Sequence, residues 1–198
     1  MSVSRFSRQS VQAGFPKQQN VWDGITQPAA MDPLSSITLT GSQASVNFNS
    51  IPQTYTHLQI RAIARETGAA TGSDNFYLQF NNDIGSNYSW HFLYGSGSAA
   101  GVASAASATY ATGNGMAAGG DLANAYGASI IDILDYANTH KNKTIRSFTG
   151  DDLNGSGYIQ LVSGGWRNSS TNAITSITLA PQSNAFAQYS SFALYGIR

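Results

Sequence analysis

The stretch "SIPQTYTHLQIRAIAR" (Ser50–Arg65) alternates between two kinds of side chain. Its even positions, such as Leu58, Ile60 and Ala62, are mostly apolar or small, whereas its odd positions are mostly polar or charged. A period of two is typical of a β-strand with one buried face, because successive side chains point to opposite sides of a sheet. The stretch therefore predicts a long strand whose even side lies in a core. We expect its odd side to be a pairing or subunit-facing surface.

About ten short segments with strand character occupy residues 35–198. They are rich in β-branched and aromatic residues, Gly- and Asn-rich turns separate them, and no helical period alternates with them. The turns include a predicted hairpin at "NTHKNK" (138–143) and a tight turn at "DDLNGSG" (151–157). A further hairpin is predicted where "GSQ" separates residues 36–40 from residues 44–48. The fold class expected is all-β, an antiparallel β-sandwich or jelly roll that follows an extended N-terminal arm.

Residues 1–34 and residues 95–120 lack this pattern. The first segment holds three of the five prolines and no periodic apolar stripe, which predicts an extended arm. We expect the arm to dock on a neighbouring molecule, with folding back onto its own domain as the alternative. Its partner-binding residues would be Phe6, Phe15, Val21, Trp22 and Ile25. The second segment is mainly Ala, Gly and Ser, and its seven glycines disfavour a helix. A mobile or partner-packed insertion loop is therefore predicted there.

Charge and composition exclude several classes of partner. Ten Lys and Arg balance ten Asp and Glu, and only 10% of the 198 residues are charged. Nucleic acid is therefore not an expected partner, because phosphate binding needs clustered basic residues. The chain has no cysteine, so disulfides and thiolate zinc sites are excluded. No long apolar run predicts a membrane span, and the N-terminus lacks the apolar core of a signal peptide. We expect synthesis in the cytoplasm and no membrane partner.

Candidate catalytic groups are sparse. His57 and His91 lie mid-strand, and together with Asp83 they suggest a metal site across strands; an exposed or hydrogen-bonded histidine is the simpler interpretation. Counting alone does not exclude a Ser–His–Asp site, but no G-x-S-x-G elbow is present. One Glu and nine Asp provide no convincing pair of carboxylates for hydrolysis. We expect no catalytic residue, no cofactor and no metal, and an Asx-turn rather than a calcium loop at residues 151–157.

Aromatic residues are the stronger feature, since the chain has ten Tyr and three Trp. Tyr and Trp suit protein interfaces, and their rings also stack on sugars. Trp166 follows a glycine and precedes the polar stretch "RNSSTN", so it is the best candidate for an exposed aromatic. Tyr94 is the second. These two residues are the predicted glycan contacts, although core packing would explain either one.

Several whole segments together resemble a recurrent domain in structural proteins of tailed bacteriophage virions. They are "FNSIPQTYTHLQIRAIAR" (48–65), "YLQFNND" (77–83), "NYSWHFLYGSGS" (87–98), "KNKTIRSFTGDDLNGSG" (141–157) and "SGGWRNSSTNAITSITLAPQSNAFAQYSSFALYGI" (163–197). The opening "MSVSRFSRQSVQAGFPKQQNVWDG" is similar to the arms that precede this domain. The resemblance implies a β-sandwich virion component, commonly trimeric, and it implies no catalytic residues.

The resemblance does not fix the position on the particle. An apolar arm before one compact domain suits a subunit that clamps neighbouring capsid proteins, and no repetitive shaft or coiled coil precedes the domain. We therefore expect a non-enzymatic capsid decoration (cement) protein on the virion surface, assembled as a homotrimer. Its partners would be the major capsid protein or other virion proteins. Head fibres also use such sandwiches. The alternative function is a tail-fibre or baseplate appendage that binds host surface polysaccharide.

Overall fold

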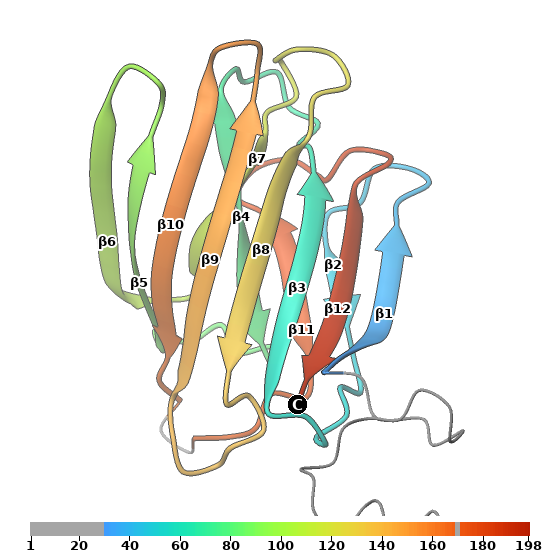
Figure 1. The fold of residues 1–198 in the computed structure, drawn as a ribbon, viewed down its shortest axis with the longest axis vertical. Coiled ribbons are helices and arrows are strands. Elements are labelled where there is room, and N and C mark those ends of the chain that lie inside the picture. The colour runs from blue at the N-terminus through green and yellow to red at the C-terminus, as the bar shows by residue number, and fades with distance from the viewer. Residues whose placement is uncertain (1–29, 169–170) are drawn as a thin grey trace, which may run out of the picture.

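The computed structural model describes residues 30–168 and 171–198, and every regular element in these ranges is a β-strand (Figure 1). Two antiparallel sheets pack face to face, so the predicted β-sandwich is confirmed. The larger sheet has the order β1 (Met31–Thr38), β12 (Ser191–Ile197), β3 (His57–Ala64), β8 (Gly127–Leu134), β9 (Lys143–Asp152), β10 (Gly157–Trp166), β5 (Tyr88–Gly95) and β6 (Ala100–Ala108). The smaller sheet has the order β2 (Val46–Phe48), β11 (Ile177–Pro181), β4 (Ser73–Phe80) and β7 (Ala111–Ala117). No helix that could cross a membrane occurs in these two ranges.

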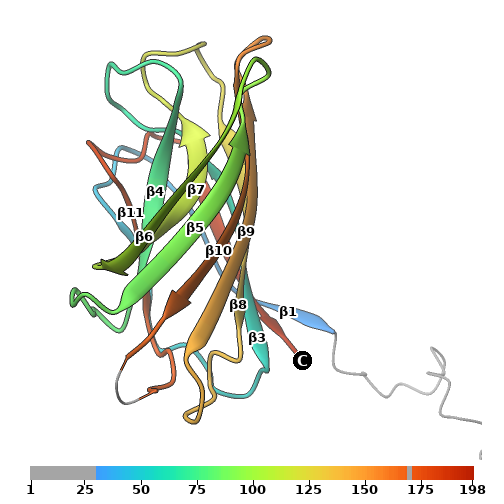
Figure 2. The same ribbon diagram turned by 90° about the vertical axis from the view of Figure 1, so that its left-hand side faces the viewer.

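The strands pair in a nested order. β5 pairs with β6, β4 with β7, β3 with β8, β2 with β11 and β1 with β12. Such nesting arises when one long two-stranded ribbon is rolled into a sandwich. The β9–β10 hairpin lies between β8 and β5 and widens the larger sheet. In Figure 2, β5 and β6 run diagonally across one side of the sandwich, and β5 contacts β7 of the smaller sheet. The fold therefore places β6 at one free edge of the larger sheet and β1 at the other.

The core forms where the inner faces of the two sheets meet. Leu58, Ile60, Ala62 and Ala64 of β3 are all buried, which confirms the even-sided core predicted from the alternation. The strand itself begins only at His57. Other core positions come from both sheets and include three phenylalanines in mutual edge-to-face contact, Phe76, Phe186 and Phe192.

The predicted hairpin of residues 36–40 and 44–48 is wrong. β1 pairs with β12 in the larger sheet, whereas β2 pairs with β11 in the smaller sheet. The short "GSQ" link therefore lies between strands of different layers, and Gln43 bridges to Phe186 instead. Both partner strands come from the far end of the chain, which local turn chemistry does not reveal.

The boundary between the arm and the domain also lies earlier in the chain than predicted. β1 begins at Met31, so residues 31–34 belong to the sheet and not to an arm that ends at residue 34. Pro33 is tolerated because β1 is an edge strand, and the pairing register shifts between Pro33 and Ser35. Tyr55 and Arg198 both donate hydrogen bonds to Asp32 Oδ2, at 3.0 and 2.7 Å, and hold the strand in place.

The insertion loop predicted for residues 95–120 is likewise wrong, because this segment forms β6 and β7. Small residues are needed where β7 meets the larger sheet. A Cβ on Gly127, at the start of β8, would lie 2.7 Å from the Met116 Cα, and one on Gly119 would lie 2.1 Å from the Gly68 carbonyl oxygen. At β7 the backbones approach too closely for large side chains, so the Gly- and Ala-rich sequence of this strand fits tight packing, whereas β6 is an exposed edge strand.

Candidate interaction surface

The outer face of the larger sheet carries a row of exposed apolar side chains across five neighbouring strands. In the strand register, Ile130 lies opposite Phe148, Phe148 opposite Leu161, Leu161 opposite Leu93, and Leu93 opposite Val102. Ile63 and Ile159 lie in the next row of the same face. We call these seven residues the apolar band: Ile63, Leu93, Val102, Ile130, Phe148, Ile159 and Leu161. Their exposed fractions range from 44% at Ile130 to 78% at Val102.

A polar row borders the apolar band on one side. It runs across six strands through Gln59, Asp132, Arg146, Ser163, His91 and Ser104. Gln59 Nε2 donates a hydrogen bond of 2.9 Å to Asp132 Oδ1, and Arg146 lies 3.7 Å from Asp132 Oδ2. Asp132 and Arg146 thus balance each other beside the band, and the band itself is uncharged.

Two shallow depressions open within the apolar band. One has a volume of about 530 Å³ and lies between Leu93, Val102 and Leu161. The other, of about 260 Å³, lies between Leu93, Phe148 and Ile159. A more polar hollow of about 540 Å³ continues beside them towards Ser89 and Arg167. Such a surface offers apolar contact and shape, and it suits a protein partner better than a small polar substrate.

The odd side of β3 continues this outer face towards β12. Arg61 lies opposite Ile130 and stacks on the ring of Tyr195, 5.3 Å from its centroid. Arg65 is instead buried just beyond the strand and donates four hydrogen bonds of 2.8–3.0 Å to backbone carbonyls of residues 119–125. Arg65 therefore contacts backbone carbonyls, whereas Arg61 contacts an aromatic ring and the Gln59 side chain.

The predicted exposed aromatic Trp166 is wrong, because its side chain is only 1% exposed. Its indole packs between Phe80 and Tyr88, with ring centroids at 5.6 and 6.4 Å, and Nε1 donates a 2.7 Å hydrogen bond to Asp83 Oδ2. The polar residues that follow Trp166 suggested an exposed side chain, but β10 ends inside the core. Partial burial alone would raise the pKa of Asp83, but hydrogen bonds from Trp166, Asn87 and the Gly85 amide outweigh it and lower that pKa.

Tyr94, the second predicted glycan contact, is half-buried on the inner side of β5. It closes a ladder of aromatic rings in which Trp90 stacks on Phe92 at 5.4 Å, Phe92 lies 6.1 Å from Tyr94, and Tyr94 lies 5.4 Å from Tyr158. The Tyr94 ring covers Gly101 of β6, where a Cβ would lie 2.5 Å from ring atoms. The ladder therefore fills the space beneath the outermost strands while leaving part of each ring accessible.

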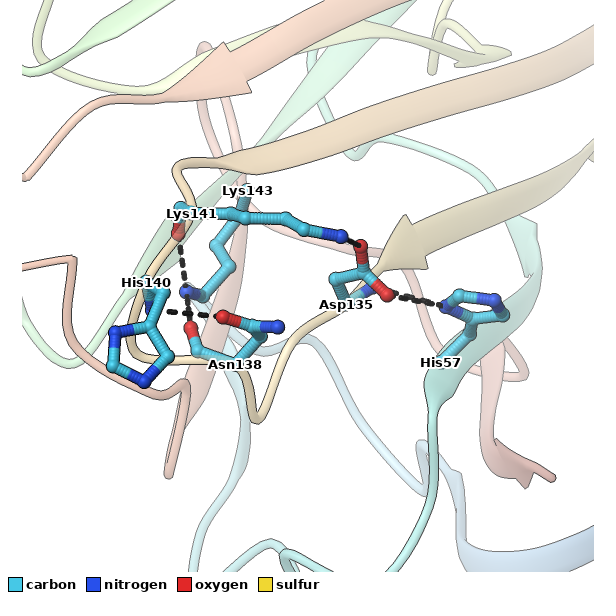
Figure 3. Close-up of polar contacts among 6 residues, drawn as sticks. All are labelled: His57, Asp135, Asn138, His140, Lys141 and Lys143. Atoms are coloured by element: carbon cyan, nitrogen blue, oxygen red, sulfur yellow. Dashed lines mark hydrogen bonds and ion pairs between the residues drawn. The ribbon is translucent and has the colours of Figure 1, made fainter.

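The histidines do not come together. His57 is on β3 and His91 on β5, with β8, β9 and β10 between these strands, so the metal site suggested with Asp83 is wrong. His57 Nδ1 accepts a 2.9 Å hydrogen bond from the backbone N–H of Asp135 (Figure 3). Within residues 30–168 and 171–198, no group of three or more His, Cys, Asp or Glu side chains could hold a metal ion.

The β8–β9 turn, the predicted hairpin at 138–143, is held by polar contacts (Figure 3). Lys141 Nζ donates to Asp135 Oδ2 at 2.9 Å, and this hydrogen bond lowers the pKa of Asp135. Lys143 is 1% exposed, and its Nζ donates to the backbone carbonyls of Asn138, Lys141 and Thr171. Burial lowers the pKa of Lys143. The Lys143 ammonium group, bonded to three backbone carbonyls, therefore fixes the turn. No sequence pattern indicated that this lysine is buried.

The "DDLNGSG" turn joins β9 to β10. Asp152 Oδ1 accepts a 3.1 Å hydrogen bond from the Gly155 amide, three residues on, which is one residue further than in the predicted Asx-turn. Asp151 accepts hydrogen bonds from the Ser73 hydroxyl at 2.6 Å and from the Tyr158 amide at 2.9 Å. Burial raises the pKa of Asp151 above its ordinary value. Both carboxylates thus serve the turn and the packing of β4 against it.

The predicted partner-binding residues of the arm, from Phe6 to Ile25, lie outside the described residues. The sequence reasoning did not find the apolar band, although a signal was present. The segments "SIIDIL", "TIRSFTG" and "YIQLVSG" carry large apolar residues on both alternating faces. In a sandwich, only one of these faces enters the core.

Comparisons with known proteins add no relative: no family model, no curated protein and no solved structure matches this chain.

Proposed function

We propose that this protein is a non-enzymatic structural subunit of a bacteriophage virion, and that it decorates the capsid surface as a homotrimer. A phage virion is proposed because several segments of the chain resemble domains of tailed-phage virion proteins. The apolar band is the observation that supports a role in assembly. Contiguous exposed apolar surface of this extent is characteristic of protein–protein contact sites. Synthesis in the host cytoplasm and a final place on the virion surface follow from this role.

The residues before β1 supply the proposed attachment to the major capsid protein. β1 starts at Met31 on the edge of the larger sheet, so a chain that begins at residue 30 keeps every described strand. Capsids without the protein are mixed with the full chain or with residues 30–198, and bound protein is measured after sedimentation. We expect the full chain to bind and to raise the temperature at which the capsids release DNA.

We expect residues 30–198 to bind at least about tenfold more weakly, because the apolar arm would supply the affinity. Equal binding by both chains would contradict attachment to the capsid through the N-terminal arm. Binding of neither chain would contradict capsid decoration itself.

The alternative is an appendage that binds host surface polysaccharide, and the aromatic ladder favours it. Trp90, Phe92, Tyr94 and Tyr158 leave partly accessible rings, and such rings stack on sugars. The test is a glycan array probed with the full chain and with a Tyr94→Ala variant. Binding that the variant loses would support the appendage, whereas an array without signal would contradict it.

A further inference from the structure

We propose that the apolar band is the surface on which a second copy of this chain packs. The inference deepens the proposed function, because it assigns residues to the expected homo-oligomer, and it concerns the purified protein without any capsid. Three observations carry it: the extent of the band, its lack of charge, and its continuity with an unprotected sheet edge.

The extent of the band matches one half of a stable interface. From Ile130 on β8 to Val102 on β6 the row crosses four strand spacings, about 19 Å at the usual distance between strands. Seven large side chains that are roughly half exposed present on the order of 600 Å² of apolar surface. A stable protein interface buries about 800 Å² per partner, so the band and its rim suffice.

The lack of charge favours a copy of the same chain. The band contains no ionisable side chain, and Asp132 and Arg146 beside it are within ion-pair distance of each other. Arg61, opposite Ile130 at the β3 end of the row, is not matched by this ion pair, and it stacks on Tyr195. A surface that is apolar and neutral can pack against itself across a two-fold axis, and different parts of it can pack against one another around a three-fold axis.

The band also reaches the free edge at β6. The other edge strand, β1, is protected by Asp32, by Pro33 and by a shift in register. β6 has the sequence "AGVASAASA", with no proline and no charge, and its register with β5 shifts only near its end, between Tyr88 and Trp90. An unprotected edge beside an exposed apolar face is stable in solution when another subunit covers both.

The test measures self-association of the full chain by sedimentation equilibrium from about 1 to 100 µM. The double variant Phe148→Ser/Leu161→Ser removes the centre of the band. Its matched control, Ile84→Ser/Leu122→Ser, removes two apolar residues of similar exposure outside the band. We expect the parent and control to form the same oligomer, and we expect the band variant to associate at least about tenfold more weakly.

Circular dichroism and urea unfolding verify that each variant is folded. If the double variant does not fold, Val102→Ser replaces it, because that side chain is 78% exposed on an edge strand. A parent chain that is monomeric at every concentration overturns the inference, as does a folded band variant that assembles like the parent. An oligomer that does not bind capsids leaves the inference standing and contradicts the proposed capsid role.

Discussion

Single side chains in this protein serve as anchors in places where their neighbours in sequence suggest exposure. Trp166 precedes a polar loop, yet its ring is in the core and its Nε1 is bound to Asp83. Arg65 and Lys143 are charged, yet both are buried and donate only to backbone carbonyls in the contacts described above. A buried charge is tolerated when hydrogen bonds satisfy it, and removal of one partner then costs more than the bond itself.

At this scale we predict that Trp166→Phe destabilises the fold by about 1–3 kcal/mol, because Asp83 loses a hydrogen bond inside a partly buried site. Trp90→Phe is the matched control, since Trp90 Nε1 has no hydrogen-bond partner among the described residues. The control should change stability little. Urea unfolding at neutral pH measures both, and equal losses would contradict the role of the Trp166–Asp83 bond.

The same contact predicts a pH dependence. The pKa of Asp83 lies below its ordinary 3.8 in the folded state, so the ionised carboxylate stabilises the fold above that pH. The contribution is lost as the pH falls below 3.8 towards the lowered pKa. Asp151 has a raised pKa and acts in the opposite direction. Trp166 donates to Asp83, whereas Asp151 is bonded by Ser73 and Tyr158. The unfolding free energy of Trp166→Phe should therefore fall less steeply than the parent's in acid; parallel curves would exclude this explanation.

At the scale of elements, two strands of small residues differ in packing: β7 lies in close backbone contact with β8, whereas β6 is an exposed edge strand. Sequence reasoning found β3, β8, β9 and β10 because they are rich in β-branched and aromatic residues and because turn residues separate them. It missed β6 and β7 because their residues are small. Small residues are what a strand needs when another backbone lies in van der Waals contact with it.

We therefore predict that Gly127→Ala destabilises the protein by about 1–3 kcal/mol, because the new Cβ would lie 2.7 Å from the Met116 Cα and push β7 from β8. Gly41→Ala is the control, since no atom of the described residues lies within 4 Å of the place that its new Cβ would take. Thermal unfolding measures both variants. A neutral Gly127→Ala would mean that β7 packs against the larger sheet less closely than described.

For the whole molecule, the nested pairing makes the two ends of the described chain depend on each other. β1 pairs with β12 from Met31 to Thr38, and Asp32 bonds to both Tyr55 and Arg198. The apolar band is a property of the same scale, because five strands that are scattered over residues 93–161 contribute to one row.

The pairing predicts different outcomes for two truncations. A chain of residues 30–198 keeps all of β1, and we expect it to unfold at the temperature of the full chain. A chain of residues 35–198 loses the first half of β1 and both Asp32 contacts, so its midpoint should fall by about 5 °C or more. Scanning calorimetry distinguishes them. Equal midpoints for the two truncated chains would contradict the boundary at Met31.

The sequence by itself determined the local properties of this protein: an all-β class, the inward face of β3, the β8–β9 and β9–β10 hairpins, and a weakly charged surface. Each of these depends on residues close together in the chain, where alternation and turn chemistry act. Only the tertiary structure decided the partners of β1 and β2, the burial of Trp166 and the alignment of the apolar band. These depend on register between strands far apart in sequence, which is fixed by burial of the whole core and not by any one segment.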